Sequence, residues 1–273
     1  MSNPATAKRN PAAHWPEYFI EAWALGMFMV SAGMFTLLLE SPASALHAAI
    51  PDAFLRRLLT GAAMGLTAIA LIYSPWGRRS GAHMNPAVTL SFLRLGKIAP
   101  SDAAFYIFAQ FIGGTLGVCG VLIAFGSAFA APPVSYVATV PGSAGVGAAF
   151  AAEIAISALM IFVVLMVSSS ARLARFTGLC AGTLVCLFIS FEGPLSGMSI
   201  NPARSFASAL PGQIWTAFWI YLTAPVIGMQ LGTAAFLGLR GSSTGPCAKL
   251  QHTTGERCIH CGYEPSALYG RQP

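Results

Sequence analysis

Charged residues are scarce in this chain, and their scarcity excludes most soluble folds. Asp, Glu, Lys and Arg make up 9% of the 273 residues, against about 25% in an average soluble domain. Hydrophobic residues account for 55%, which places the chain among integral membrane proteins. The net charge of +6 then fits an excess of Lys and Arg on the cytoplasmic side. We therefore expect membrane lipid as a partner and no nucleic acid.

The motifs of membrane enzymes are also missing. The sequence has no His-Glu-x-x-His zinc motif and no phosphate-binding loop. It also gathers no Ser, His and Asp within an apolar segment, as nucleophilic catalysis would require. We therefore expect a protein that is not an enzyme and that needs no cofactor for its main activity.

Six apolar runs are each close to the ~20 residues that a membrane-spanning helix needs. They cover residues 18–39, 56–74, 103–126, 145–168, 175–192 and 214–238. With these spans, twelve Lys and Arg residues fall on one side of the membrane and three on the other: Arg56, Arg57 and Arg204. This asymmetry predicts that both termini are cytoplasmic, in a multi-pass protein that we expect in the plasma or inner membrane.

The two halves of the sequence repeat each other at a nearly constant distance. Three landmarks recur 115 to 117 residues later: the Asn-Pro-Ala tripeptide at 85–87 and 201–203, and Gly-xxx-Gly segments at 60–65 and 177–182 and at 113–117 and 228–232. The glycine pairs are typical of helices that approach closely in lipid. Three spans in each half is an odd number, so the second half must enter the membrane from the opposite face, as an inverted repeat.

Each Asn-Pro-Ala tripeptide predicts the start of a short helix. Asn is a favoured N-cap, and Pro suits the first helical position because its missing N–H would have had no partner there. The next breakers, Ala99-Pro100 and Pro211-Gly212, leave about ten residues, or roughly 15 Å, which is half of the hydrocarbon core. Two re-entrant half-helices are therefore expected, one in each half of the chain.

Inversion brings the N-termini of the two half-helices together at the midplane, where non-helical backbone must line a cavity or be buried in protein. We expect the side-chain amides of Asn85 and Asn201 to project donors into the centre of a pore. The carbonyls of loops 81–84 and 197–200 would line it, and the positive ends of both helix dipoles would repel cations. The alternative is that both Asn residues merely cap their helices.

These motifs resemble those of the major intrinsic protein family, the aquaporins and aquaglyceroporins. The resemblance rests on the stretches 80–90 and 197–205 and covers residues 18 to about 240. It implies an all-α membrane protein with six transmembrane helices, two re-entrant half-helices, one pore in each subunit and a homotetramer. Repeat one would span about 18–126 and repeat two about 145–238. Cytoplasmic segments at 1–17 and 241–273 would flank this channel domain of residues 18–240.

The resemblance assigns the narrowest ring of the pore to Met64, Ile189, Met198 and Arg204. In the family, the Arg donates to the permeating molecule and repels cations; a lipid-facing anchor is the alternative for Arg204. Members similar to water-selective channels usually carry Phe and His where this chain has Met64 and Ile189. Three apolar sides and one donor side suit glycerol or urea. Ser205, in contrast, stands where glycerol-type members typically carry Asp.

We therefore expect a passive channel for water and small neutral solutes that excludes protons and ions. A gradient-coupled secondary transporter of a small polar solute is the alternative. The resemblance implies that Glu21 and Glu153 accept hydrogen bonds from the re-entrant loops, whereas a transporter would use them as a proton relay. His83 is expected to line the cytoplasmic vestibule, with a pH gate as its alternative role.

The segment after Gly245 differs from the rest in composition, because it holds three of the six cysteines. Cys258 and Cys261 have the spacing of a zinc ribbon, and Cys247 with either His252 or His260 would complete four ligands. A reducing cytoplasm disfavours disulfides there. The segment is therefore either a structural zinc site made by Cys247, His252, Cys258 and Cys261 or a basic tail without a fold of its own.

Overall fold

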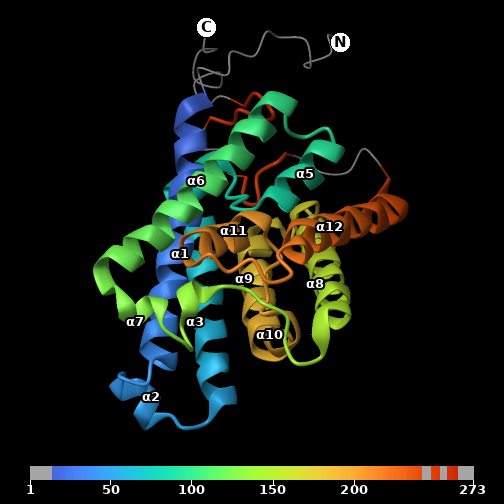
Figure 1. Cartoon of the computed structure of the whole chain (residues 1–273). Helices are drawn as coiled ribbons and strands as arrows, with labels where there is room; N and C mark the ends of the chain where they lie inside the picture. Colours follow the sequence, from blue (N-terminus) through green and yellow to red (C-terminus); the bar gives the residue numbers. More distant parts are fainter. Residues whose placement is uncertain (1–13, 242–246, 253–256, 264–273) are drawn as a thin grey trace, which may run out of the picture.

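The computed structural model describes residues 14–241, 247–252 and 257–263, which form helices and loops without strands. Six helical segments within these ranges are long and apolar enough to cross a membrane (Figure 1). The long helices are α1 (Trp15–Glu40), α3 (Ala53–Tyr73), α6 (Pro100–Phe125), α8 (Gly145–Ser168), α9 (Thr177–Leu187) and α12 (Trp219–Arg240). The shorter ones are α2 (Ala45–Ala49), α4 (Pro75–Ser80), α5 (Pro86–Arg94), α7 (Ser127–Ala130), η3 (Ser135–Val137), η4 (Ala174–Phe176), η5 (Phe188–Glu192), α10 (Gly193–Ser196) and α11 (Pro202–Gly212).

The helix packing repeats in the two halves of the chain. Helix α1 packs chiefly on α6 and α8 on α12, while α3 packs on α9 across the two halves. A Cβ atom at Gly117 would overlap the carbonyl oxygen of Gly26, and one at Gly232 would overlap that of Ala158. Only glycine permits this backbone contact in either half, as expected for small residues between membrane helices.

Helices α5 and α11 are the predicted half-helices. The Oδ1 atom of Asn85 accepts a hydrogen bond from the Ala87 amide at 2.8 Å, and that of Asn201 accepts one from the Ala203 amide at 3.1 Å. Both Asn residues therefore cap their helices. With nine and eleven residues, the helices are about 14 and 16 Å long. Figure 1 shows α5 above α11 inside the bundle.

The helix limits differ from the predicted ones at three places. Helix α5 ends at Arg94 rather than near Ala99, because Gly96 has a φ of +66° and its amide donates back to Leu93. The fifth span widens from α9 into the π-helix η5 before α10. The sixth span begins at Trp219 instead of residue 214, after a turn that starts with Gln213 at a φ of +50°.

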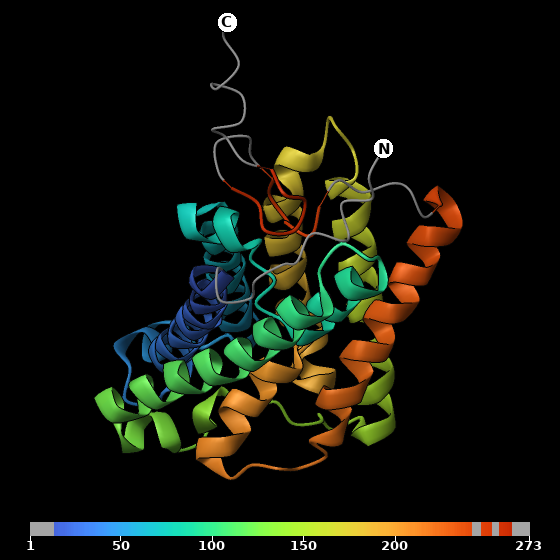
Figure 2. The ribbon, with the colours of Figure 1, turned by 90° about the horizontal axis from the view of Figure 1, so that it is seen from above.

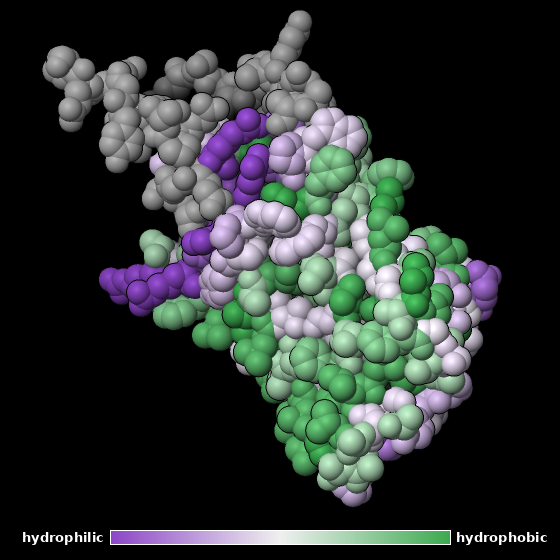
Figure 3. Space-filling model, turned by 90° about the vertical axis from the view of Figure 1, so that its left-hand side faces the viewer, coloured by the Kyte–Doolittle hydropathy of each residue, from purple (hydrophilic) through white to green (hydrophobic). Residues whose placement is uncertain are grey.

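The outside of the bundle is largely apolar. Bulky side chains such as Phe19, Leu66, Phe108 and Ile123 are exposed by 65 to 86%. Figure 3 shows hydrophobic side chains over much of one side, with hydrophilic ones gathered at the end that carries the tail. A surface of this kind is unsuited to water and is suited to lipid, where apolar side chains have no reason to be buried.

The described tail segments, 247–252 and 257–263, lie against the end of the bundle where α1 begins, which we call the tail face. Figure 2 shows these segments in red near the middle of the helices, seen from above. Ala248, Leu250 and Ile259 are buried and belong to the same hydrophobic core as the transmembrane helices. The tail is therefore packed onto the bundle in the regions that the structure describes.

Candidate functional site

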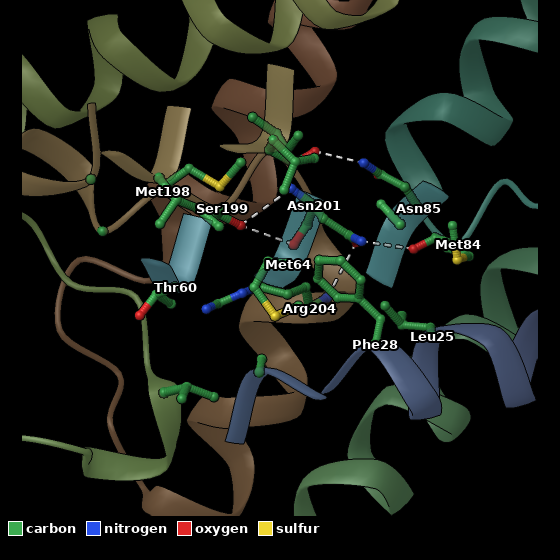
Figure 4. Close-up of a pocket in the computed structure, with 18 of the residues that line it drawn as sticks. Leu25, Phe28, Thr60, Met64, Met84, Asn85, Met198, Ser199, Asn201 and Arg204 are labelled. Atoms are coloured by element: carbon green, nitrogen blue, oxygen red, sulfur yellow. Dashed lines mark hydrogen bonds between the residues drawn. The ribbon is translucent and has the colours of Figure 1, made fainter. Parts of the chain in front are cut away.

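A cavity of about 510 Å³ passes beside the tips of α5 and α11 (Figure 4). Glu40 and Arg57 line it toward the end of the bundle opposite the tail face, and His83 and Leu250 line it at the tail face. Apolar side chains of α1, α3, α8 and α9 form most of the wall between them. The cavity thus extends from one end of the bundle to the other.

The tips of the half-helices are joined by two reciprocal hydrogen bonds. The amide nitrogen Nδ2 of Asn85 donates to the carbonyl of Ile200, and that of Asn201 donates to the carbonyl of Met84, both at 2.7 Å (Figure 4). We expected both amides to project donors into the centre of the pore, and these two bonds leave one N–H of each amide for that role. One N–H of each Asn amide donates to the opposite loop, and the carbonyl oxygens of Ile200 and Met84 accept these two bonds. Both Asn residues still line the cavity.

Glu21 holds the first re-entrant loop from α1. Its carboxylate accepts hydrogen bonds from the Ser80 hydroxyl at 2.7 Å, the His83 amide at 3.1 Å and the Met84 amide at 2.7 Å. The side chain is fully buried. Because the carboxylate accepts from the loop backbone at both oxygens, it fixes the loop in a conformation that no helix or sheet provides.

Glu153 holds the second loop from α8 in the same way. It accepts from the Ser196 hydroxyl at 2.8 Å, the Ser199 amide at 2.6 Å and the Ile200 amide at 2.8 Å. It is also fully buried. The two carboxylates thus occupy equivalent places in the inverted repeat.

Sequence reasoning missed a further pair of residues that support the loops. The Tyr106 hydroxyl donates to the Ser80 carbonyl at 2.7 Å, and the Tyr221 hydroxyl donates to the Ser196 carbonyl at 2.6 Å. These tyrosines are 115 residues apart, which is the spacing of the repeat, so a complete comparison of the halves would have found them. The Gln110 amide also donates to Glu21, at 2.9 Å, and has no equivalent in the second half, where Pro225 stands.

The four residues of the expected ring, Met64, Ile189, Met198 and Arg204, all line the cavity. Ile189 lies on the π-helix η5, an irregular turn of the kind that is frequent at functional sites. The backbone amide of Arg204 donates to Asn201 at 3.2 Å. Among the residues that the structure describes, the buried Nη1 atom of Arg204 has no hydrogen-bond partner. This donor is therefore available to a molecule inside the cavity.

His83 lies at the tail-face end of the cavity, but not in an open vestibule. It is 3% exposed, and its Nδ1 atom lies 3.1 Å from the Thr89 hydroxyl. Its Nε2 atom lies 2.6 Å from the carbonyl oxygen of Ala248. His83 thus lines the tail-face end of the cavity and also contacts the tail, a contact that the sequence did not predict.

The tail brings together the predicted cluster of metal-ligating residues. The Sγ atoms of Cys247 and Cys258 are 3.2 Å apart, and Nε2 of His252 is 3.3 Å from Sγ of Cys261. All four candidate ligand atoms lie within 4.8 Å of one another. The hydrogen bond between the two thiols lowers the pKa of Cys258 and raises that of Cys247, so the pair shares one proton and it is the spacing of the four atoms that points to a metal. The cluster could therefore hold a metal ion.

His260, the other candidate for the fourth ligand, points instead to the first re-entrant loop. Its Nε2 atom lies 3.2 Å from the Ser80 carbonyl and 3.4 Å from the Tyr106 hydroxyl. Burial, and to a smaller extent the neighbouring His83, lower the pKa of His260 to about 4. The structure thus separates the two histidines that the sequence could not distinguish.

Six membrane-crossing helices, with two half-helices meeting tip to tip beside a cavity that extends through the bundle, define a class of membrane channel. The model of one protein family, described as major intrinsic protein, matches residues 11–236. The chain therefore belongs to the major intrinsic protein family and is an integral, multi-pass membrane protein. Members of this family are channels and not enzymes.

Similar proteins include two maize aquaporins. The chain is 37% identical over 186 residues to aquaporin NIP2-2 of Zea mays, covering 68% of this chain and 60% of that protein. It is 35% identical over 199 residues to aquaporin NIP2-3 of Zea mays, covering 72% and 64%. The chain thus spans somewhat under two thirds of the length of these curated relatives.

A solved structure shares the fold. The X-ray structure of the aquaglyceroporin from Plasmodium falciparum superposes with a TM-score of 0.65, covering 82% of this chain and 95% of that chain. The two sequences are 20% identical, so this likeness shows the fold alone.

Proposed function

We propose that this protein is a passive transmembrane channel for water and small neutral solutes such as glycerol or urea, and that it excludes ions and protons. One observation carries the proposal: a cavity extends through the bundle and is lined at its centre by Asn85, Asn201 and Arg204. The half-helix dipoles place partial positive charge at the same point. A cation or proton would meet these charges without its hydration shell, whereas a neutral molecule would not be repelled.

The bracing of the loops favours a channel over a gradient-coupled transporter. A proton relay needs carboxylates that face the permeation path and exchange protons. Glu21 and Glu153 are fully buried and are engaged by hydroxyl and amide donors of the loops. Neither carboxylate is among the described residues that line the cavity. We therefore assign both carboxylates to holding the loops.

The ring of Met64, Ile189, Met198 and Arg204 supports passage of solutes larger than water. Its one donor side, the Nη1 atom of Arg204, has no partner of its own in the described chain, while the other three side chains are apolar. Met is flexible and polarisable, so the aperture can adapt to its contents. Such a ring fits the carbon backbone of glycerol on one side and its hydroxyls on the other.

Stopped-flow light scattering of proteoliposomes tests this function. Vesicles are shrunk with sucrose, glycerol or urea in separate runs, and empty liposomes give the background. With a membrane-permeant chelator present to keep the Cys and His residues of the tail free of metal, we expect fast shrinkage in all three osmolytes and fast re-swelling in glycerol or urea. Fast water flux without re-swelling would limit the channel to water. Flux that depends on an ion or pH gradient would instead support the transporter.

We further propose that the tail face is cytoplasmic and that the protein forms a homotetramer in the plasma or inner membrane. The excess of Lys and Arg on that side supports the orientation. Apolar side chains on the outside, such as Leu66 and Phe108, supply surface for lipid and for neighbouring subunits. Protease accessibility of the tail in sealed vesicles tests the orientation, and mass measurement in detergent tests the assembly.

We also propose that Cys247, His252, Cys258 and Cys261 bind one structural zinc ion. Three thiolates and one imidazole form a common ligand set for structural zinc. In a tetrahedral site with Zn–S distances of about 2.3 Å, neighbouring ligand atoms are roughly 3.5–3.8 Å apart. The observed spacing, from 3.2 Å to at most 4.8 Å, needs little adjustment to reach this geometry. Metal analysis of the purified protein tests the stoichiometry.

A further inference from the structure

The described tail segments do more than gather four ligands: they cover the tail-face end of the cavity. Leu250 is 6% exposed and lines the cavity beside His83. Its amide donates to the Gly81 carbonyl at 3.1 Å, and the Ala248 carbonyl lies 2.6 Å from the His83 ring. Residues 248–250 are therefore hydrogen-bonded across the loop that carries the first Asn-Pro-Ala tripeptide.

The second tail segment supports the first from behind. His260 lies 3.2 Å from the Ser80 carbonyl, and its ring is parallel to that of His83 at 6.2 Å. The Lys249 ammonium, buried at 3% exposure, donates to the Arg257 carbonyl at 3.1 Å and so joins the two segments. The hydrogen bonds of Leu250, Ala248 and His260 to the first loop all fall on residues 80–83, at the mouth of the cavity.

The tail has little apart from the ligand cluster to hold this shape. The two segments contain six and seven described residues without helix or strand, and their buried apolar side chains are few. Segments far smaller than about 40 residues fold stably when a metal, a disulfide or a partner supplies the free energy. Structural zinc supplies enough to fold such units outright. A metal at the cluster would fix residues 247–252 against 257–263, and thereby hold Leu250 in place.

We propose that this tail is a metal-dependent plug: a zinc ion bound by Cys247, His252, Cys258 and Cys261 keeps Leu250 in the mouth of the channel, and loss of the ion releases it. The inference rests on the channel function proposed above. It makes permeability respond to zinc availability, or to any reagent that removes thiolate ligands, on the side of the membrane that holds the tail.

The first test measures metal binding without any transport. Cobalt(II) is titrated into the reduced, metal-free protein, and the absorption of a tetrahedral cobalt–thiolate site is recorded. We expect one equivalent to bind to the wild type and none to the double variant C258S/C261S. The matched control C119S/C180S removes two cysteines from the transmembrane spans and should bind as the wild type does. Equal binding by C258S/C261S would overturn the site.

The second test measures flux through the same proteins in liposomes by stopped-flow light scattering. We expect zinc-loaded wild type to conduct water slowly and a membrane-permeant chelator to raise the rate severalfold. C258S/C261S should be fast with or without zinc, and C119S/C180S should respond as the wild type does. L250A shortens the plug and leaves all four ligands, so it should conduct severalfold faster than the wild type with zinc bound.

The outcomes separate the plug from the channel. Equally fast flux in zinc-loaded and metal-free wild type would overturn the plug and keep the channel. Slow flux in the metal-free wild type, with fast flux in L250A, would overturn the dependence on metal. Background flux in every form, L250A included, would overturn the channel function itself.

Discussion

The two re-entrant loops are nearly equal in how they are held and different in what covers them. Residues 80–85 and 196–201 share positive φ angles at the same positions, a buried Glu brace, and a Tyr hydroxyl on the first carbonyl. Behind the first loop, Gly81 faces the tail at Ala248, whereas behind the second, Gly197 faces Val140 in the connection between α7 and α8. The fold requires the features that the two loops share. The two ends of the pore differ in the segment that covers each loop.

The side chains that face the pore diverge as well. Three residues after Asn85 the chain has Val88, and three residues after Asn201 it has Arg204. His83 in the first loop corresponds to Ser199 in the second, whose hydroxyl lies 2.6 Å from that of Ser205. An inverted repeat thus supplies symmetric scaffolding, while Arg204 on α11, whose counterpart on α5 is Val88, and the tail at one end make the path asymmetric.

Removing one of the two carboxylates that hold the loops should have the largest effect on stability. It tests whether Glu21 and Glu153 contribute equally to the free energy of unfolding. Glu21→Gln and Glu153→Gln each replace a buried carboxylate that accepts three or more hydrogen bonds. Because hydrogen bonds to charged groups contribute about 1.5–3 kcal/mol each, we expect each variant to lose about 3 kcal/mol or more of stability. Thermal unfolding in detergent, followed by size-exclusion chromatography, measures the loss.

The control for the braces is Glu40→Gln. Glu40 pairs with Arg56 at 3.2 Å, but its side chain is 27% exposed, and such pairs contribute about 0–1 kcal/mol. The Glu21 variant could be as stable as Glu40→Gln while the Glu153 variant fails to fold. The two loops would then share their geometry but would not contribute equally to the free energy of unfolding.

Removing the asymmetric charge should have the next largest effect. Arg204→Val gives the second half the residue that Val88 provides in the first half, so both sides of the midplane become apolar. We expect ion and proton leakage to rise while water flux persists, because the positive barrier near the centre is lost. Collapse of a pH gradient in dye-loaded proteoliposomes measures the leak. Arg94→Gln, which alters an exposed hydrogen bond to Gln230, is the control and should stay tight.

The fold and the braces could be predicted because each depends on a local pattern that occurs twice. Asn and Pro set a helix start within a few residues, and Glu21 and Glu153 hold the same place near the start of the first span of each half. Tyr106 and Tyr221 are 115 residues apart, which is the distance of the repeat, so a comparison of the halves could have found them. Close packing of α1 on α6 likewise follows from Gly-xxx-Gly spacing alone.

The contacts of the tail could not be predicted, because they join residues about 165 positions apart and have no copy in the other half. Nothing near Ala248 in the sequence indicates that its carbonyl meets His83. His252 and not His260 is the candidate ligand because His260 lies against the Ser80 carbonyl of the bundle. The sequence does not reveal this contact. The bonds between the loops were not foreseen for a related reason: the partners of the Asn amides are carbonyls of the opposite loop, and a local motif does not reveal them.

Changing one side of the ring should have a moderate effect and should affect the solute more than water. Ile189→His replaces an apolar side chain on η5 with a ring that extends further from the backbone and carries a donor. The aperture narrows beside Arg204, so we expect slower re-swelling in glycerol or urea and little change in water shrinkage. Ile189→Leu, of similar volume, is the control. Equal slowing of water and solute would show that Ile189 acts on the whole helix bundle and not on the aperture.

The smallest effect concerns the glycines behind the loops, and it sharpens the comparison most directly. Gly81→Ala and Gly197→Ala both place a Cβ at a positive φ, 107° and 82°, which costs roughly 1–2 kcal/mol wherever the backbone must hold it. At Gly197 the new methyl group would lie 3.2 Å from the backbone of Val140, whose neighbour Thr139 is hydrogen-bonded to Ser205 of α11 at 2.7 Å. At Gly81 it would lie 3.1 Å from the Ala248 carbonyl, and the tail can move away.

We therefore expect Gly197→Ala to lower the midpoint of thermal unfolding by a few degrees more than Gly81→Ala does. Gly81→Ala should instead raise water flux of the zinc-loaded protein, because the displaced tail no longer seats Leu250. Equal destabilisation by both variants, with unchanged flux in Gly81→Ala, would mean that the tail is as rigid a cover as the connection between α7 and α8. Neither the tail nor the connection between α7 and α8 would then move, and the two ends of the pore would differ in sequence alone.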